Sequence, residues 1–158
     1  MDALAVQNNS QESVTTKQYI VIKIDNELFG IDIQYIDNIV RMQKITRVPK
    51  CQDYFKGVIN LRGEIVPVMS LRKRFGLADD EITNTTRIII VKPEQQATAG
   101  VLVDMVKEVV TLEDAEIEKT NVGVMENGQM YIGAVGKYNG ELISILNLQA
   151  VVLDREQA

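Results

Sequence analysis

The residues that could support catalysis or metal binding fall into two carboxylate clusters and one thiol. The clusters are Asp79-Asp80-Glu81 and Glu113-Asp114-Ala115-Glu116, and the thiol is Cys51. Carboxylates can act as general acids and bases or as oxygen ligands for a hard cation. A thiol can act as a nucleophile when a neighbouring base deprotonates it. Enzymatic and metal-binding functions are therefore the first possibilities to weigh.

The absence of histidine argues against both possibilities. The chain has none, which excludes the commonest general base, the commonest metal ligand and every Ser-His or Cys-His pair. Neither carboxylate cluster has the D-x-[DN]-x-[DN]-G spacing of a calcium loop. We therefore interpret both clusters as solvated loops, expect no catalytic role for Cys51, and predict a protein that is not an enzyme and has no metal or cofactor.

Arg62 is a charged side chain between two apolar runs, GVIN (57–60) and EIVPVM (64–69). The runs predict a β-hairpin, and Gly63 supplies the positive φ that short hairpin connections need. A hairpin turn needs a glycine but does not need an arginine. Arg62 is either a solvated turn residue or a contact residue, whose planar head with several donors suits protein recognition.

Nucleic acid is a disfavoured partner. The net charge is −5, tryptophan is absent and aromatic residues make up 5% of the chain, so neither a basic face nor a stacking platform is evident. The run Arg72-Lys73-Arg74 is interpreted as an ordinary charged helix surface, with phosphate binding as the alternative. Charge is uneven along the chain: residues 1–76 carry 11 Lys/Arg and 8 Asp/Glu, and residues 77–158 carry 6 and 14.

The elements that position these residues are mostly short strands. Residues 1–16 are polar and aperiodic, which predicts a disordered tail. YIVIKI (19–24) and LFGI (28–31) predict a second hairpin. Pro49 interrupts a long connection. After EIVPVM, Ser70 is the expected N-cap of a short helix that stops at Gly76.

The second half repeats this pattern. RIIIVKPEQQATAGVLVDMVKEVV aligns with YIVIKIDNELFGIDIQYIDNIV and places Gly100 on Gly30 and Ile88 on Ile20, with a hairpin two residues longer. GAVGKYNGELISILNLQAVV aligns with GVINLRGEIVPVMSLRKRF with one residue inserted. That alignment places Gly133 on Gly57, Tyr138 on Arg62 and Asn147 on Ser70. Matching glycines, turn and cap together indicate an internal duplication.

A duplicated unit of short strands predicts a mainly β fold with two small antiparallel barrels side by side, because closed barrels leave no long exposed edges. The expected division is a disordered tail (1–16), a first barrel (17–84) and a second barrel with a C-terminal helix (85–158). The groove between the barrels is the expected binding place.

The stretch GVINLRGEIVPVMSLRKRFG (57–76) closely resembles the signature of the CheW family of chemotaxis coupling proteins. The resemblance extends over YIVIKIDNELFGIDIQYIDNIVR, ITRVPK, TRIIIV, GVLVDMVKEVV and ELISILNL, and so covers residues 18 to about 155. It implies paired SH3-like five-stranded barrels with short helices. Relatives often carry Asp where Ser70 stands and Glu where Asn38 stands.

The resemblance also implies a function. Members of the family are non-enzymatic adaptors that couple the cytoplasmic tips of chemoreceptors to the regulatory domain of the histidine kinase CheA. By this resemblance we expect a cytoplasmic protein that is monomeric when free, is recruited to membrane-associated receptor arrays and contacts the kinase through strand edges and loops of the second barrel. An adaptor in a non-chemotaxis two-component pathway is the alternative. The receptor-binding residues implied by the resemblance are Ile36, Asn38, Ile39, Gly57, Asn60, Arg62, Gly63, Val103, Val106 and Val109.

Overall fold

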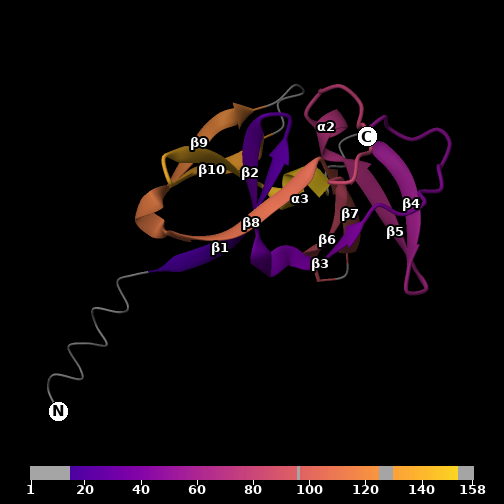
Figure 1. Ribbon diagram of the computed structural model, residues 1–158, viewed down its shortest axis with the longest axis horizontal. Coiled ribbons are helices and arrows are strands. Elements are labelled where there is room, and N and C mark those ends of the chain that lie inside the picture. Colours follow the sequence, from indigo (N-terminus) through magenta and orange to yellow (C-terminus); the bar gives the residue numbers. More distant parts are fainter. Residues whose placement is uncertain (1–14, 96, 125–129, 153–158) are drawn as a thin grey trace, which may run out of the picture.

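The computed structural model describes residues 15–95, 97–124 and 130–152 (Figure 1). Most of the predicted tail lies outside the described residues, and Thr16 already begins the first strand. The strands of the described part are β1 (Thr16–Ile24), β2 (Glu27–Asp32), β3 (Ile36–Arg41), β4 (Phe55–Leu61), β5 (Glu64–Ser70), β6 (Arg87–Glu94), β7 (Ala97–Val103), β8 (Met105–Glu113), β9 (Ile117–Val124), β10 (Met130–Tyr138) and β11 (Glu141–Leu146). The helices are α2 (Leu71–Arg74), α3 (Leu148–Val152) and the 3₁₀ turns η1 (Ile33–Tyr35) and η2 (Asp114–Glu116).

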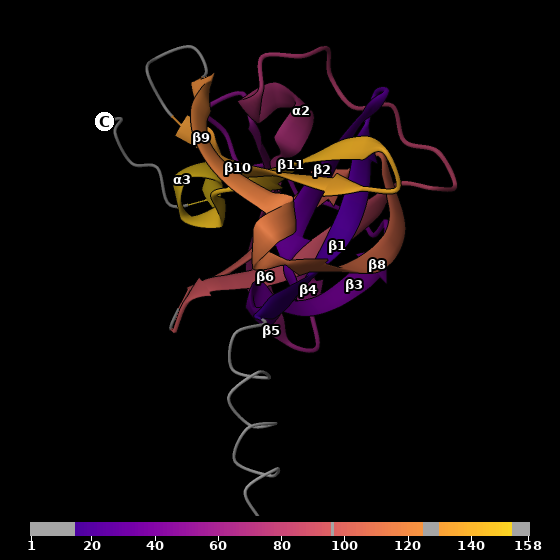
Figure 2. The same ribbon diagram turned by 90° about the vertical axis from the view of Figure 1, so that its left-hand side faces the viewer.

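The strands form two packed sheets, which confirms the predicted mainly β fold with two subdomains and short helices (Figures 1 and 2). One sheet has the strand order β3-β6-β7-β5-β4 and the other the order β8-β1-β2-β11-β10-β9. We call them the first and second sheets. The first has the expected five strands. The second has six in the described part of the chain.

The extra strand has a counterpart that is only partly formed in the first sheet. β9 pairs with β10, with Glu118 opposite Val135. At the equivalent place, Thr46 forms an isolated bridge with Val58 of β4, through hydrogen bonds of 2.8 and 2.9 Å. Pro49 follows within three residues and lacks an N–H group, so pairing does not extend along this segment. The bridge nevertheless ties the connection between β3 and β4 to β4, an outer strand of the first sheet.

The sheets do not follow the predicted division into residues 17–84 and 85–158. The hairpin β1-β2 belongs to the second sheet, and the hairpin β6-β7 belongs to the first. Each exchanged hairpin is held by an antiparallel pair, β1 with β8 or β6 with β3, and by a parallel pair, β2 with β11 or β7 with β5. The two copies of the repeat therefore exchange hairpins, and each sheet contains strands from both copies.

The exchange leaves three apolar cores. A central cluster between the sheets contains residues from both copies, including Ile22, Ile31, Ile89 and Val101. A smaller cluster lies within each sheet, around Ile59 and Ile88 in the first and around Leu112 and Ile143 in the second. β1, β6 and β7 supply residues to the central cluster on one face and to a sheet core on the other. This explains why their sequences are nearly continuous apolar runs.

The duplication is visible in the N-terminal caps of the helices α2 and α3. Ser70 N donates to Tyr54 O and Asn147 N donates to Tyr131 O, both at 2.7 Å. The Ser70 hydroxyl accepts from the backbone N–H of Lys73, and the Asn147 amide oxygen accepts from that of Ala150. The predicted match of the two caps is therefore confirmed.

The strand register corrects two details of the sequence alignment. Val21 pairs with Gly30 and Ile90 pairs with Gly100, so the second hairpin is one residue longer, not two, and Ile89 takes the place of Ile20. Leu61 pairs with Glu64 and Tyr138 pairs with Glu141, so the two later hairpins align without an insertion. Asn139 therefore corresponds to Arg62, and Ala134 corresponds to Gly57.

Candidate functional site: the apolar seam and the Arg62 turn

The seam between the sheets carries an apolar rim formed by two outer strands. Ile36 and Ile39 of β3 pair with Val91 and Ile89, and Val106 and Val109 of β8 pair with Ile22 and Ile20. The four partner residues all belong to the central cluster. Residues directly opposite each other in an antiparallel pair face the same side of the sheet. The four rim residues therefore continue the central core outward.

The rim residues retain exposed surface. Ile36, Ile39 and Val106 are partly buried against the central cluster, and Val109 is 49% exposed. Figures 1 and 2 both show β3 and β8 near one another on the lower side of the molecule. The structure thus brings together these four members of the predicted receptor-binding set.

Other members of the predicted set have structural roles. Val103 has no exposed surface and lies within the central cluster, so it cannot touch a partner directly. Gly57 adopts a φ of 138°, and a Cβ there would lie 2.2 Å from Thr46 O. This close approach allows the bridge to Val58 to form. Asn38 is half-buried, and its amide oxygen accepts from the backbone N–H of Ile39 at 2.8 Å.

The Arg62 turn connects β4 and β5 through two residues, Arg62 and Gly63, because Leu61 pairs with Glu64. Arg62 and Gly63 have φ values of 54° and 86°, the pattern of a type I′ turn, which favours Asn-Gly. The Asn60 side-chain oxygen accepts from Gly63 N at 3.0 Å and fixes the turn. A left-handed conformation costs a residue other than glycine about 1 kcal/mol. Arg62 is thus held in a conformation that its own preferences oppose.

The Arg62 side chain is exposed and, within the described part of the chain, makes no hydrogen bond or ion pair. In both views the β4–β5 turn and β3 lie on the lower side of the molecule (Figures 1 and 2). The turn and the rim therefore face the same side. The second copy has Asn139-Gly140 at its turn, with φ values of 52° and 79°.

The basic run on α2 has a role that the sequence interpretation missed. Arg72 donates to Asp25 Oδ1 at 2.6 Å, to Asp104 Oδ2 at 2.8 Å and to Ala78 O, and its side chain is only 13% exposed. The hydrogen bond to Asp25 raises the pKa of Arg72 above its ordinary value. Arg72 therefore ties α2 to the turn of the exchanged hairpin β1-β2.

Arg74 makes a second tie between the copies. Its Nε donates to Val151 O at 2.9 Å, at the C-terminal end of α3, where carbonyl groups lack helical partners. Its guanidinium also lies 4.0 Å from the ring centre of Tyr54 and 5.2 Å from that of Tyr131. The arginines are thus structural bridges and not an ordinary charged surface. Only their positions two and four residues after the cap could have suggested this.

The carboxylate cluster 79–81 is likewise not simply a solvated loop. The Asp80 side chain is 3% exposed and accepts the hydroxyl hydrogen bond of Ser70. Burial raises the pKa of Asp80 above its ordinary value, although Ser70 and Lys56 oppose that shift. Asp79 is exposed, and its hydrogen bond from Lys56 at 2.7 Å lowers its pKa. In the other cluster, Glu116 accepts from Glu113 N at 2.8 Å and caps η2.

The described residues contain no group of three or more His, Cys, Asp or Glu side chains arranged to hold a metal ion. Cys51 is exposed, and its thiol lies 3.7 Å from Pro49 O. Within the described ranges, no helix is long and apolar enough to cross a membrane. The features that stand out are an apolar rim and an arginine without an internal partner, which together are typical of a protein-binding scaffold.

Comparison with known proteins agrees with this class. The model of the CheW-like domain matches residues 18–156. The chain is 37% identical to the chemotaxis protein CheW of Bacillus subtilis, with 93% of each chain covered, and 33% identical to that of Thermotoga maritima, with 85% of this chain and 87% of that one covered. The solved structure of the scaffolding protein TtCheW from Thermoanaerobacter tengcongensis aligns with a TM-score of 0.79 at 32% identity, over 87% of this chain and 92% of that one.

The chain therefore belongs to the CheW-like family. A chemotaxis scaffold or adaptor role is the function that this membership and these relatives support, as the sequence predicted. The solved relative is described as a scaffolding protein, which agrees with the expectation of a non-enzymatic protein.

Proposed function

We propose that the protein couples the cytoplasmic tips of chemoreceptors to the histidine kinase CheA, as a cytoplasmic adaptor recruited to receptor arrays. The observation that carries the proposal is the continuity of the four rim residues with the central core. An apolar rim of this kind suits the side of a helical hairpin, which presents apolar side chains at three- and four-residue spacing.

The receptor tip would bury Ile36, Ile39, Val106 and Val109. Arg62 would reach a carboxylate or carbonyl group at the margin of that contact and fix its register, because charge-assisted hydrogen bonds are directional. Asn60 and Gly63 contribute by forming the turn, and Gly57 by allowing the bridge between Thr46 and Val58 to form. Asn38, next to Ile39, is a further contact candidate.

The kinase regulatory domain would dock on the second subdomain. Because the hairpins are exchanged, this subdomain contains β1 and β2 as well as β8–β11. A receptor bound at the seam would touch β3 of one sheet and β8 of the other, so it can act on both subdomains. We expect the coupling free energy between the two partners to be about 1–3 kcal/mol, as is typical of allosteric proteins.

Introducing a charge on the rim tests the proposal. Val109→Glu places a carboxylate on the rim, and we expect it to weaken binding of a receptor cytoplasmic fragment at least tenfold, or about 1.4 kcal/mol. Leu142→Glu is the matched control, since Leu142 is 62% exposed on β11 and does not belong to the rim. Receptor binding measured by calorimetry should be unchanged in the control. Equal affinity in both variants and the wild type would rule out the rim as the receptor contact.

A further inference from the structure

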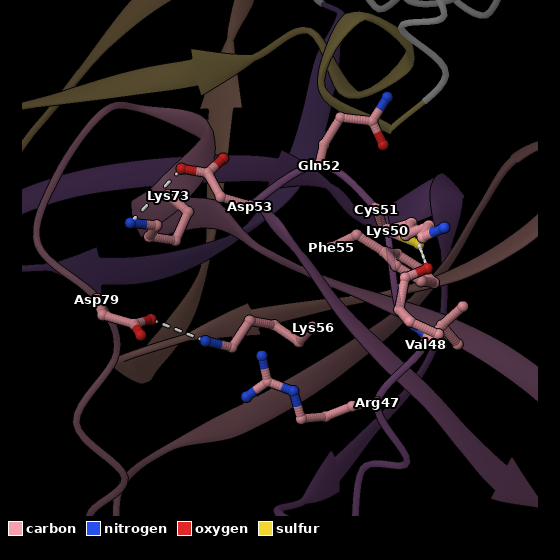
Figure 3. Close-up of a pocket in the computed structure, with 11 residues that line it drawn as sticks. Arg47, Val48, Lys50, Cys51, Gln52, Asp53, Phe55, Lys56, Lys73 and Asp79 are labelled. Atoms are coloured by element: carbon pink, nitrogen blue, oxygen red, sulfur yellow. Dashed lines mark hydrogen bonds and ion pairs between the residues drawn. The ribbon is translucent and has the colours of Figure 1, made fainter.

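A polar cavity lies at the end of β4 away from the Arg62 turn. Its volume is about 550 Å³, and the connection between β3 and β4 forms most of its wall. The remaining wall comes from the start of β4, from α2 and from the segment that follows α2. The lining residues are Arg47, Val48, Pro49, Lys50, Cys51, Gln52, Asp53, Phe55, Lys56, Lys73 and Asp79 (Figure 3). None of the rim residues lines this cavity, so it is a separate site.

Four cations line the cavity, and only two are neutralised. Lys56 pairs with Asp79 at 2.7 Å, and Lys73 pairs with Asp53 at 3.6 Å. Arg47 and Lys50 are exposed and make no ion pair or hydrogen bond within the described part of the chain. The cavity therefore has an excess of two positive charges.

The excess positive charge of the cavity is part of a wider difference in charge between the first sheet and the rest of the chain. The stretch 36–103, which forms the first sheet, has eleven Lys/Arg and seven Asp/Glu, whereas the rest of the chain has six and fifteen. The exchange of hairpins makes this contrast larger than the contrast between the two halves of the sequence. A basic cavity on the basic side of an acidic protein attracts anions, because its positive charge exceeds that of the carboxylates around it.

The cavity wall is shaped before any ligand binds. The bridge between Thr46 and Val58 holds one end of the connection, and Lys50 adopts a φ of 63°. Val48, 41% exposed, and Phe55 provide apolar surface beside the cations. In Figure 3 the amino groups of Lys50 and Lys73 lie on opposite sides of the cavity, and the head of Arg47 points towards that of Lys56. The cations are thus spread out and do not converge on one point.

We propose that this cavity binds an acidic segment of a protein partner. Several carboxylates along an extended chain would match the spaced cations, and one apolar side chain would pack on Val48 and Phe55. A single small anion would use only part of this arrangement. A nucleic acid would need bases stacked on aromatic rings, and Phe55 is the only aromatic residue among the lining residues. The proposal does not depend on the receptor-coupling function.

The test uses the full chain and a fluorescein-labelled peptide of glutamate and leucine, followed by fluorescence anisotropy. We expect the double variant Arg47→Gln/Lys50→Gln to weaken binding roughly tenfold, because it removes two exposed charge pairs that each contribute modestly to affinity. The matched control is Arg41→Gln/Lys44→Gln, which removes the same charge from the end of β3 and the start of the connection, outside the cavity. The control should retain the affinity of the wild type, and added salt should weaken binding by the wild type. Thermal unfolding of both variants should match that of the wild type, since all four side chains are exposed.

Several results would overturn the proposal. They are absence of peptide binding by the wild type, equal loss of affinity in both double variants, and equal binding of a peptide in which glutamine replaces glutamate. Displacement of the peptide by inorganic phosphate at comparable concentration would instead indicate a site for small anions. Tighter binding of a single-stranded oligonucleotide that also depends on Arg47 and Lys50 would indicate a nucleic-acid site.

Discussion

Each copy of the repeat contains an equivalent β-hairpin, β4-β5 in the first and β10-β11 in the second. Their turns, Arg62-Gly63 and Asn139-Gly140, have nearly the same backbone and different side chains. The φ values at the first position are 54° and 52°. Asn139-Gly140 is the sequence that such a turn prefers, whereas Arg62 adopts the left-handed conformation at a cost. The same turn is thus formed by a favourable residue, Asn139, in the second copy and by an unfavourable residue, Arg62, in the first. A strained residue that the fold does not require is a reasonable indicator of a functional contact.

The largest expected effect concerns Gly57, which leaves room for the bridge between Thr46 and Val58 in the first sheet. The second sheet has no glycine at the equivalent position. Gly57→Ala would place its Cβ 2.2 Å from Thr46 O at a φ of 138°, so we expect a loss of about 3 kcal/mol or more in the free energy of unfolding. The equivalent position holds Ala134, and Ala134→Gly should cost only about 1 kcal/mol. Urea denaturation of both variants makes the comparison. Similar losses of unfolding free energy in the two variants would mean that the first sheet has no special need for glycine at position 57.

The next effect concerns the ties between each helix and its exchanged hairpin. Arg72 bonds to Asp25 beside β1-β2, and at the equivalent place Gln149 Nε2 donates to Pro93 O at 3.2 Å beside β6-β7. We expect Arg72→Ala to cost about 2 kcal/mol and Gln149→Ala about 1 kcal/mol or less, because hydrogen bonds between charged groups are stronger. High salt should reduce the first loss and leave the second unchanged. Denaturation at two ionic strengths would show whether the two ties differ in this way.

A smaller effect is expected from the two helix caps. Ser70 is supported by the buried carboxylate of Asp80, whereas Asn147 caps α3 with its own amide. Since burial raises the folded-state pKa of Asp80 above its ordinary value of 3.8, the folded state binds more protons than the unfolded state in the pH range just above that value. Stability contributed by this group is therefore present at low pH and is lost as pH rises through the folded pKa. Asp80→Asn should gain stability relative to the wild type over that range.

Asp79 provides the matched control for this pH dependence. Its folded-state pKa is lowered by Lys56, so its contribution is present above the ordinary pKa of 3.8 and is lost as pH falls through the folded pKa. Asp79→Asn should therefore lose stability relative to the wild type as pH rises. Unfolding free energies measured across acidic pH should change in opposite directions for the two variants. The same direction for both would show that the burial of Asp80 does not control its titration.

The sequence could predict the duplication, the caps and the strands because these depend on local patterns such as glycine positions and apolar runs. It could not predict the exchange of hairpins. Ile20 and Ile89 lie in equivalent apolar runs, and nothing local specifies which copy each hairpin should join. The register of the pairs Val21–Gly30 and Ile90–Gly100 is likewise settled only by packing.

The candidate site shows the same division between local and long-range information. The resemblance to the CheW family implied Ile36, Ile39, Val106 and Val109, and the structure places them on one rim. Val103 belongs to a similar run, but the packing of two sheets buries it completely. The roles of Arg72 and Arg74 depend on contacts with residues 47 and 77 positions away, which no local pattern contains.

The central claim is that Arg62 occupies an unfavourable backbone conformation because its side chain is needed for contact with a partner. The most direct test measures the unfolding free energy and the affinity for a receptor cytoplasmic fragment in Arg62→Asn and in the reciprocal variant Asn139→Arg. We expect Arg62→Asn to stabilise the fold by about 0.5–1 kcal/mol and to weaken receptor binding. Asn139→Arg should destabilise the fold by a similar amount and leave receptor binding unchanged. Unchanged receptor affinity in Arg62→Asn, or a loss of stability in that variant, would contradict the claim.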